Sequence, residues 1–354
     1  MTRLGRALLA EIGPLYLAGL AVLLVLLTVQ FLLGVLADVL ARGAPVGLVA
    51  RYLLFKLPAA ASAGLTLALL FAALLALARL VADRELRALL ALGVSPAALL
   101  RPLLVAGVAT AAVAGVNNEL VVPWAEDRAL EVQKEILLTA PSTFLQEGTF
   151  FSDAQGRSLF LGELAPGGRA EDVVILAPGG SRGPREMIEA DRGRLDEAAG
   201  VWRLDGVRVR TFRDGRPSLD MRAERGTVPV TDLAAAAVGR VDPVTLSLGE
   251  LADRLRADRR DPAAWTALHR KAAEPLAAVA FAVFALAVAM TGVRREAPVG
   301  WVSVLGLTFA YYATWSVTKL LGAQGTVPAW AAGWAPFATY LAAGTALLAW
   351  TWRR

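Results

Sequence analysis

A polar stretch covering about residues 125–271 separates two sets of three long apolar segments in this chain. A helix that crosses the bilayer core needs ~20 predominantly apolar residues, and each segment is long enough for one crossing. Because three crossings precede the polar stretch, it is expected on the side of the membrane opposite the N-terminus. The sequence therefore predicts a membrane-embedded body with one extracytoplasmic domain, which narrows the function to transport, gating or assembly at a membrane.

The composition agrees with a membrane protein. The chain is 56% hydrophobic with a mean hydropathy of +0.53, and its charges concentrate in the polar stretch and in short connectors. The first apolar run is too long for a signal peptide and is expected to be a retained span. The six expected transmembrane helices are 12–36, 52–77, 98–122, 272–293, 299–321 and 330–351. The expected domains are 1–124 with helices 1–3, 125–271 outside the membrane, and 272–354 with helices 4–6.

Arginines are distributed asymmetrically among the short connectors. In a six-span arrangement most of them fall on one side, whereas the other side holds mainly Arg42, with Arg51 and Lys319 near its edges. Since Lys and Arg accumulate on the cytoplasmic side, both termini are expected in the cytoplasm. This asymmetry largely explains the net charge of +5, so nucleic-acid binding is not indicated. The absence of cysteine excludes disulfides, thiolate metal sites and cysteine nucleophiles.

Within the polar stretch, residues of about 144–230 alternate between apolar and charged and are interrupted by turns. Asp214-Gly215 suits a tight hairpin turn. Short antiparallel strands with frequent glycine predict a β-sandwich or a jelly-roll fragment, and thus a β-jellyroll-like domain. Its open edges would offer strand addition to a partner, or the sheet only stabilises the membrane body. The expected strands are 158–162, 172–176, 185–190, 201–212 and 218–223, and the expected flanking helices are 123–138 and 248–259, the second capped by Ser247.

The connector between the second and third spans carries the most specific local pattern. Its sequence, RLVADRELRALLALGVSP, predicts a short amphipathic helix at 83–93, begun by Asp83 as its cap and ended by Gly93. Ser95-Pro96 then begins the third span. A stiff cytoplasmic helix suits a membrane subunit on which a separate motor pushes; the alternative is an interfacial connector anchored by arginines. The leucines expected on one side of this helix are Leu86, Leu89, Leu90 and Leu92.

The connector resembles that of the lipopolysaccharide export permeases LptF and LptG, in which an RL-x-x-D-x-E stretch leads to a G-V-S turn, here RLVADRELRALLALGVSPAALLRPLL. The likeness extends to RYLLFKLPAA, NNELVVPWAE and LHRKAAEPLAAVAFAVFALAVAMTGVRRE, and to the later GLTFAYYATWSVTKLLGAQGTVPAWAAGWAPF. It covers essentially the whole chain, more weakly in the β segment. The connector is slightly closer to that of LptF.

The resemblance implies a permease that pairs with a second permease, binds an LptB-like ATPase dimer, and extracts lipopolysaccharide or a related glycolipid. A periplasmic β-jellyroll bridge protein would receive this lipid. The chain lacks a G-x-x-x-x-G-K-[ST] phosphate loop, so the partner ATPase is expected to hydrolyse ATP with Mg, and no cofactor is expected on this chain. The residues expected to couple to the ATPase are Asp83, Arg84, Glu85, Arg87, Leu89 and Gly93, with Glu85 meeting a basic partner.

The resemblance also implies a cargo path between the first and fifth spans. Lys319 is the only formal charge between Val299 and Trp350, and a charge in such a run usually faces a polar cavity, a partner or the interface. Lys319 and Arg42 are therefore candidates for contact with an anionic lipid headgroup. The alternative for Lys319 is that it extends to the membrane surface as an anchor.

Other functional classes are disfavoured by what the sequence lacks. His269 is the only histidine, which excludes a His-based metal cluster, and no metal site is expected. Glu274 is interpreted as a capping or interface residue rather than a proton site, and Asn117 to Glu119 as partners of helix-end groups. The spans have no G-x-G-D pair or serine with a histidine partner, as an intramembrane protease would need. The remaining alternative is a mechanotransmission-type ABC permease or another membrane assembly factor.

Overall fold

The structure is a computed structural model with two compact units. One unit comprises Met1–Val29, Lys56–Glu126 and Val241–Arg354, and is helical; the other comprises Gln30–Phe55 and Asp127–Arg240, and contains the β-sheet. The residues that the structure describes are 3–31, 45–139, 150–152, 158–165, 169–177, 185–196, 201–213, 216–229, 242–295 and 300–352.

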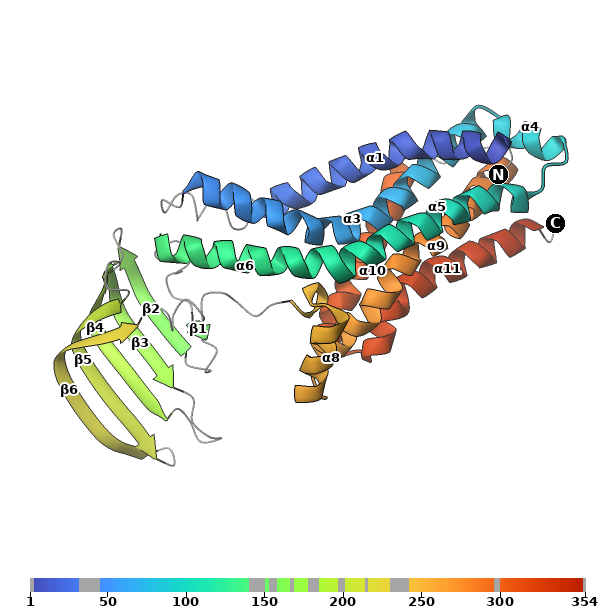
Figure 1. The fold of residues 1–354 in the computed structure, drawn as a ribbon. Coiled ribbons are helices and arrows are strands. Elements are labelled where there is room, and N and C mark those ends of the chain that lie inside the picture. The colour runs from blue at the N-terminus through green and yellow to red at the C-terminus, as the bar shows by residue number, and fades with distance from the viewer. Residues whose placement is uncertain are drawn as a thin grey trace. The chain divides into compact units, whose positions relative to one another are not determined.

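Long helices account for most of the described chain. Most of the longest are apolar around nearly the whole circumference, as helices that are buried or span a membrane are. Figure 1 shows them in chain order. Prolines stand inside several of them, as membrane helices tolerate. The helices and helical turns are α1 (Arg3–Phe31), α3 (Val46–Ala82), α4 (Glu85–Ala91), α5 (Pro96–Val116), the π-helical turn η2 (Asn117–Val121), α6 (Val122–Thr139), the 3₁₀ turn η4 (Pro243–Thr245), α8 (Leu248–Ala257), α9 (Pro262–Arg295), α10 (Trp301–Ala323) and α11 (Ala329–Trp352).

Four helices among the described residues are long and apolar enough to cross a membrane: Arg3–Val29, Val46–Ala82, Pro96–Gln133 and Pro262–Arg295. They coincide with the first four expected spans. The last two expected spans also fall on single helices, α10 with 23 residues and α11 with 24. The chain is thus a helical membrane protein with several apolar helices and a small antiparallel sheet.

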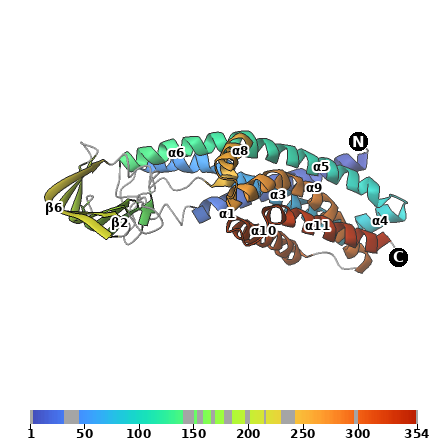
Figure 2. The ribbon, with the colours of Figure 1, turned by 90° about the horizontal axis from the view of Figure 1, so that it is seen from below.

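Helix α9 lies at the centre of the helical unit. It packs most extensively against α11 and α5, and Figures 1 and 2 show it between these two helices. Alanines make up much of its buried surface, so neighbouring backbones can approach closely. The aromatic ring of Phe281 meets Tyr311 edge-on, with ring centroids 4.6 Å apart, and Tyr340 at 5.5 Å. These contacts fix α9, α10 and α11 to one another.

The two ends of the helical unit hold different parts of the chain. Helix α4, the N-terminus of α1 and the C-terminus of α11 lie at one end, and η4 and α8 lie at the other (Figure 1). Helix α8 begins at Ser247 with a capping box, in which the Ser247 Oγ accepts from the Glu250 N–H and the Glu250 carboxylate accepts from the Ser247 N–H. The two expected flanking helices are confirmed, as α6 and α8.

The sheet is an antiparallel meander in the order β1-β2-β3-β4-β5-β6. All five expected strands are present and most are longer than expected, whereas the short β1 was not predicted. Val173 pairs with Ala190, which pairs with Val207, so small apolar side chains form one ladder across three strands. The expected Asp214-Gly215 turn lies outside the described residues. The strands are β1 (Phe150–Ser152), β2 (Ser158–Ala165), β3 (Arg169–Ala177), β4 (Glu186–Asp196), β5 (Val201–Arg213) and β6 (Arg216–Pro229).

Candidate functional site

The connector helix α4 forms as the sequence predicts, but it begins later. Helix α4 starts at Glu85, and Arg84 precedes it in the left-handed conformation with φ 61°. The prediction that Asp83 caps the helix is therefore wrong, because the reversed backbone at Arg84 stands between them. The Asp83 carboxylate instead accepts a hydrogen bond of 3.4 Å from the Arg79 Nε. Gly93 ends the helix as predicted, with φ 84°, a conformation that glycine adopts without steric cost.

Side chains on the inner face of α4 fix it to the helical unit. Leu86 is fully buried, and Leu89 and Leu90 are partly buried against the same core. Leu92 lines the same pocket as Leu89 but is 82% exposed. Arg87 donates a hydrogen bond of 3.0 Å to the Val293 carbonyl, near the C-terminus of α9. Arg87 therefore contacts its own chain at one of the expected coupling positions.

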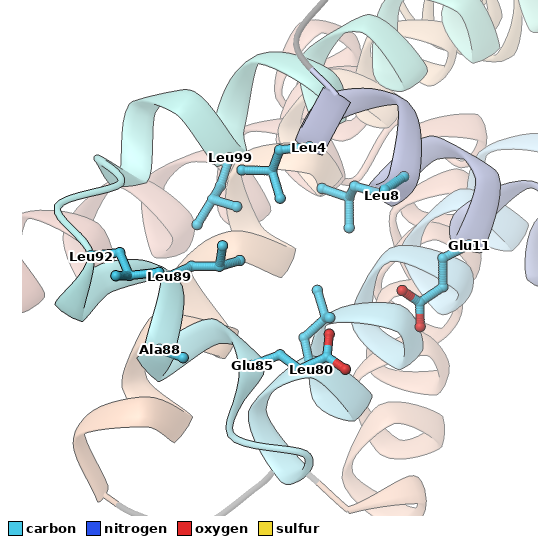
Figure 3. Close-up of a pocket in the computed structure, with 10 residues that line it drawn as sticks. Leu4, Leu8, Glu11, Leu80, Glu85, Ala88, Leu89, Leu92 and Leu99 are labelled. Atoms are coloured by element: carbon cyan, nitrogen blue, oxygen red, sulfur yellow. The ribbon is translucent and has the colours of Figure 1, made fainter.

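A pocket of about 350 Å³ opens beside α4. Figure 3 shows leucines of α1 and α4 approaching it from opposite sides, with the carboxylates of Glu11 and Glu85 at its margin. Arg79 Nη1 lies 3.2 Å from the Glu11 carboxylate and so links α3 to α1 beside the pocket. Because the lining is almost entirely leucine and alanine, this surface can receive apolar side chains, while exposed Glu85 can meet a cation. The lining residues are Leu4, Ala7, Leu8, Glu11, Leu80, Glu85, Ala88, Leu89, Leu92 and Leu99.

The opposite end of the helical unit contains buried charges. Arg270 is 1% exposed, and its Nε donates to the Glu274 Oε1 at 2.8 Å. The Trp315 indole N–H donates to the same carboxylate oxygen at 2.9 Å, and the Arg270 guanidinium lies 4.4 Å from the Trp315 ring centroid. Glu274 thus joins α9 to α10 rather than only capping a helix. The i,i+4 spacing of Arg270 and Glu274 is a signal for the pair, whereas no local pattern points to Trp315.

Lys271, the next residue along α9, connects the two halves of the chain. Its ammonium donates 2.7 Å to the Asn118 carbonyl and lies 3.0 Å from the Glu119 carboxylate. The other oxygen of Glu119 accepts from the Leu248 N–H at 2.9 Å, which satisfies a free donor at the start of α8. The expectation of a helix-end partner is confirmed for Glu119, at the start of α8, but not for Asn117, whose amide donates to the Pro58 carbonyl and the Ser62 hydroxyl inside α3. The π-helical turn η2 places these acceptors, as such turns often do at functional sites.

Lys319, the sequence-predicted headgroup residue, forms an ion pair within its own chain. Its Nζ lies 2.6 Å from the Asp242 Oδ2 and 5.8 Å from the Trp315 ring centroid. The Lys319 and Asp242 side chains are 35% and 45% exposed. Burial would raise the pKa of Asp242, but the hydrogen bond and charge of Lys319 hold that pKa below its ordinary value. Arg42, the other candidate, lies outside the described residues.

The sequence-predicted residues thus occur at two separate ends of the helical unit. Those of the connector gather around α4, and Lys319 lies near the buried Arg270 cluster, which the sequence did not single out as a site. Within the described parts of the chain, no group of three or more acidic or histidine side chains could hold a metal ion. The arrangement offers charged and apolar contact surfaces rather than a nucleophile with an adjacent base.

Comparisons with known proteins point to a single family. The sequence model of the family described as Lipopolysaccharide export system permease LptF/LptG matches residues 6–350. The chain is also similar to the proteins named lipopolysaccharide export system permease protein LptF from Escherichia coli (strain K12) and from Shigella flexneri. Each is 29% identical over 212 residues, or 59% of this chain. In these matches the chain spans 56% of the length of its relatives.

Proposed function

The chain belongs to the lipopolysaccharide export permease family LptF/LptG, and from this premise we propose that it is a transmembrane subunit of a lipopolysaccharide exporter. The subunit extracts lipopolysaccharide, or a related envelope glycolipid, from the membrane and passes it to an extracytoplasmic partner. The observation that carries this proposal is the family match over 6–350, which includes both sets of apolar helices and the sheet between them.

The proposed architecture has six membrane helices, formed by α1, α3, α5, α9, α10 and α11. Helices α10 and α11 complete the count, since 23 and 24 residues reach across a bilayer core that needs ~20. The meander β1–β6 forms part of a periplasmic β-jellyroll-like domain at 125–271, between helices 3 and 4. Its edge strands offer backbone groups to the β-jellyroll bridge protein.

We propose that an LptB-like ATPase dimer docks on the connector helix and supplies the energy by hydrolysing ATP with Mg. Glu85 is exposed and lines the leucine-rich pocket, so it presents a negative charge beside an apolar surface. Leu89 lines the same pocket and Gly93 ends the helix, whereas Asp83 and Arg87 hold the helix in place through Arg79 and Val293. A second permease of the same family completes the exporter.

For the cargo, we propose that the phosphate of an anionic headgroup contacts Lys319, and that Arg42 takes part. Lys319 is about one-third exposed at the end of α10, so a headgroup can reach it. Lys319→Glu should reduce lipid crosslinking and lipid-stimulated ATPase activity in the reconstituted complex, whereas Lys319→Arg should be tolerated because it keeps the charge. Wild-type behaviour of both variants would mean that Lys319 is only an anchor.

The proposed location is the inner membrane, with both termini in the cytoplasm. Because the chain has no native cysteine, single introduced cysteines report topology cleanly. Gly215→Cys should react with an impermeant thiol reagent from outside, and Arg295→Cys should react only after the membrane is opened. The opposite labelling pattern would refute the six-span topology.

The proposed function as a whole is tested by co-purification. An affinity-tagged chain, extracted in mild detergent, should carry with it a protein that has a phosphate-binding loop and a second six-span permease. ATP hydrolysis by this complex should rise when lipopolysaccharide is added. Recovery of the chain alone, from cells that contain both partners, would contradict a role as an exporter subunit.

A further inference from the structure

In the structure, the ammonium of Lys319 forms a direct ion pair with the carboxylate of Asp242. The distance between Lys319 Nζ and Asp242 Oδ2 is 2.6 Å, and both side chains are partly exposed. The positive charge of Arg270 also helps to lower the pKa of the Asp242 carboxylate. A carboxylate is therefore already bound at the position where the proposed function requires a phosphate.

The pairing is built into the backbone around Asp242. The Val244 N–H donates to the Asp242 Oδ1 at 3.1 Å, and the Thr245 hydroxyl donates to the Asp242 carbonyl at 2.9 Å. Further along, the Leu248 N–H is bound by Glu119. Residues 242–248 are therefore held at both ends, and the second oxygen of Asp242 is directed at Lys319. A chance contact between two mobile surface chains would lack these constraints.

A phosphate and a carboxylate compete for the same donors. Lys319 is a point charge that binds either group through its ammonium. Locally, the cations Lys319 and Arg270 are balanced by the anions Asp242 and Glu274. Because Glu274 is buried with Arg270, only the exposed pair can exchange its anion without uncovering a buried charge.

We propose that Asp242 is a built-in competitor for the anionic headgroup, which must displace its carboxylate before Lys319 binds a lipid phosphate. This inference rests on the proposed function, since it requires Lys319 to be the cargo contact. Asp242 then sets the threshold for loading, so that strongly anionic lipids load and weakly anionic ones do not. Displacement also frees the first residue of the 242–248 segment, which follows the sheet in the chain.

The test compares Asp242→Asn with Lys319→Met in the full-length chain, purified in detergent, by its Kd for purified lipopolysaccharide. Asn keeps an oxygen that can accept from Val244 but removes the competing charge. A partly exposed ion pair contributes up to ~1 kcal/mol, which is about fivefold in Kd. Asp242→Asn should therefore tighten binding by about threefold to fivefold, whereas Lys319→Met should weaken it.

The matched control is Asp261→Asn. Asp261 also caps a helical start, accepting from Ala263 and Ala264, but its ion pair is with Arg254. Removal of this carboxylate should leave the Kd for lipopolysaccharide unchanged. An equal gain in Asp261→Asn and Asp242→Asn would show a general charge effect and would overturn the inference.

Two further results separate the inference from the proposed function. If Lys319→Met weakens binding and Asp242→Asn does not tighten it, the competitor role is wrong and the cargo contact survives. If neither variant changes the Kd, Lys319 is not a cargo contact and both fail. In the Lys319→Met background, adding Asp242→Asn should not change the Kd, because the ammonium for which Asp242 competes is absent. If the two variants change the Kd of inorganic phosphate but not that of lipopolysaccharide, the site binds free phosphate and the assignment to a lipid headgroup is overturned.

Discussion

The surroundings of the two ends of helix α9 differ: one end has buried ion pairs, and the other has exposed apolar surface. At the N-terminal end, Arg270 and Lys271 are buried and bonded to Glu274 and Glu119. At the C-terminal end, the connector α4 exposes Leu92 and a leucine-lined pocket. An end whose buried charges are paired within the chain suits a fixed structural joint. An end with exposed apolar surface beside the exposed Glu85 suits a partner that comes and goes.

The glycines show the same difference. A Cβ on Gly322 would lie 2.6 Å from the Ala332 Cβ, and one on Gly333 would lie 2.5 Å from the His269 Cβ, both at the N-terminal end of α9. Among the described residues, a Cβ on Gly93 or Gly306, nearer the other end, would meet no heavy atom within 4 Å. Helix backbones are therefore in close contact at Gly322 and Gly333, as they are at Gly344 beside Phe284, whereas the exposed positions Gly93 and Gly306 face open space.

The largest effect should come from Arg270→Met. This change leaves Glu274 as a buried carboxylate without its cation, which typically costs ~3–5 kcal/mol. The melting temperature of the purified chain should fall strongly. The double variant Arg270→Met with Glu274→Leu should recover part of the loss, because an apolar pair no longer leaves a charge unpaired. Recovery is incomplete, since the Trp315 indole N–H loses its acceptor. A melting temperature unchanged in Arg270→Met would break the comparison.

A smaller effect is expected from Gly333→Ala. The added methyl would overlap His269 and crowd its backbone carbonyl carbon at 3.2 Å, so α11 must shift from α9, at ~1–3 kcal/mol. Gly306→Ala is the matched control within α10. It should be neutral or stabilising by up to ~1 kcal/mol, because alanine favours helix and the space is open. Equal destabilisation by both substitutions would show that the close contact at Gly333 is not the cause of its effect.

The smallest effect on stability is expected for Arg87→Gln. Arg87 is exposed, so its bond to the Val293 carbonyl contributes well under ~1 kcal/mol. It nevertheless connects α4 to α9, so the complex should be recovered normally while lipid-stimulated ATP hydrolysis falls. Arg101→Gln, an exposed change on α5, should alter neither measurement. Normal lipid-stimulated ATP hydrolysis in Arg87→Gln would mean that this bond does not transmit movement from the connector to α9.

Local signals in the sequence predicted much of the fold but little of the charged joint. Ser247, Ser95 and Gly93 act at helix ends as expected, because capping depends on residues three or four positions away. The contact between Lys271 and Glu119 joins residues 152 positions apart, and the pairing of Lys319 with Asp242 joins residues 77 positions apart. Such contacts depend on how helices pack, which periodicity does not specify.

The connector shows the same limit at short range. Leu92 shares a helical face with Leu89 in the sequence pattern and lines the same pocket, yet it is largely exposed. Asp83 precedes a good helix former, yet the left-handed Arg84 separates it from the helix. A backbone reversal of one residue was sufficient to defeat the capping prediction.

The central claim is that the connector end docks a motor and the opposite end does not. Its most direct measurement is recovery of the ATPase with a tagged Glu85→Lys chain, at unchanged melting temperature. Loss of one charge at a partly desolvated interface can cost a few kcal/mol, so the ATPase should be lost or strongly reduced. Glu131→Lys, a charge reversal at another exposed glutamate, should retain it. Normal ATPase recovery and normal lipid-stimulated hydrolysis with Glu85→Lys would contradict the account.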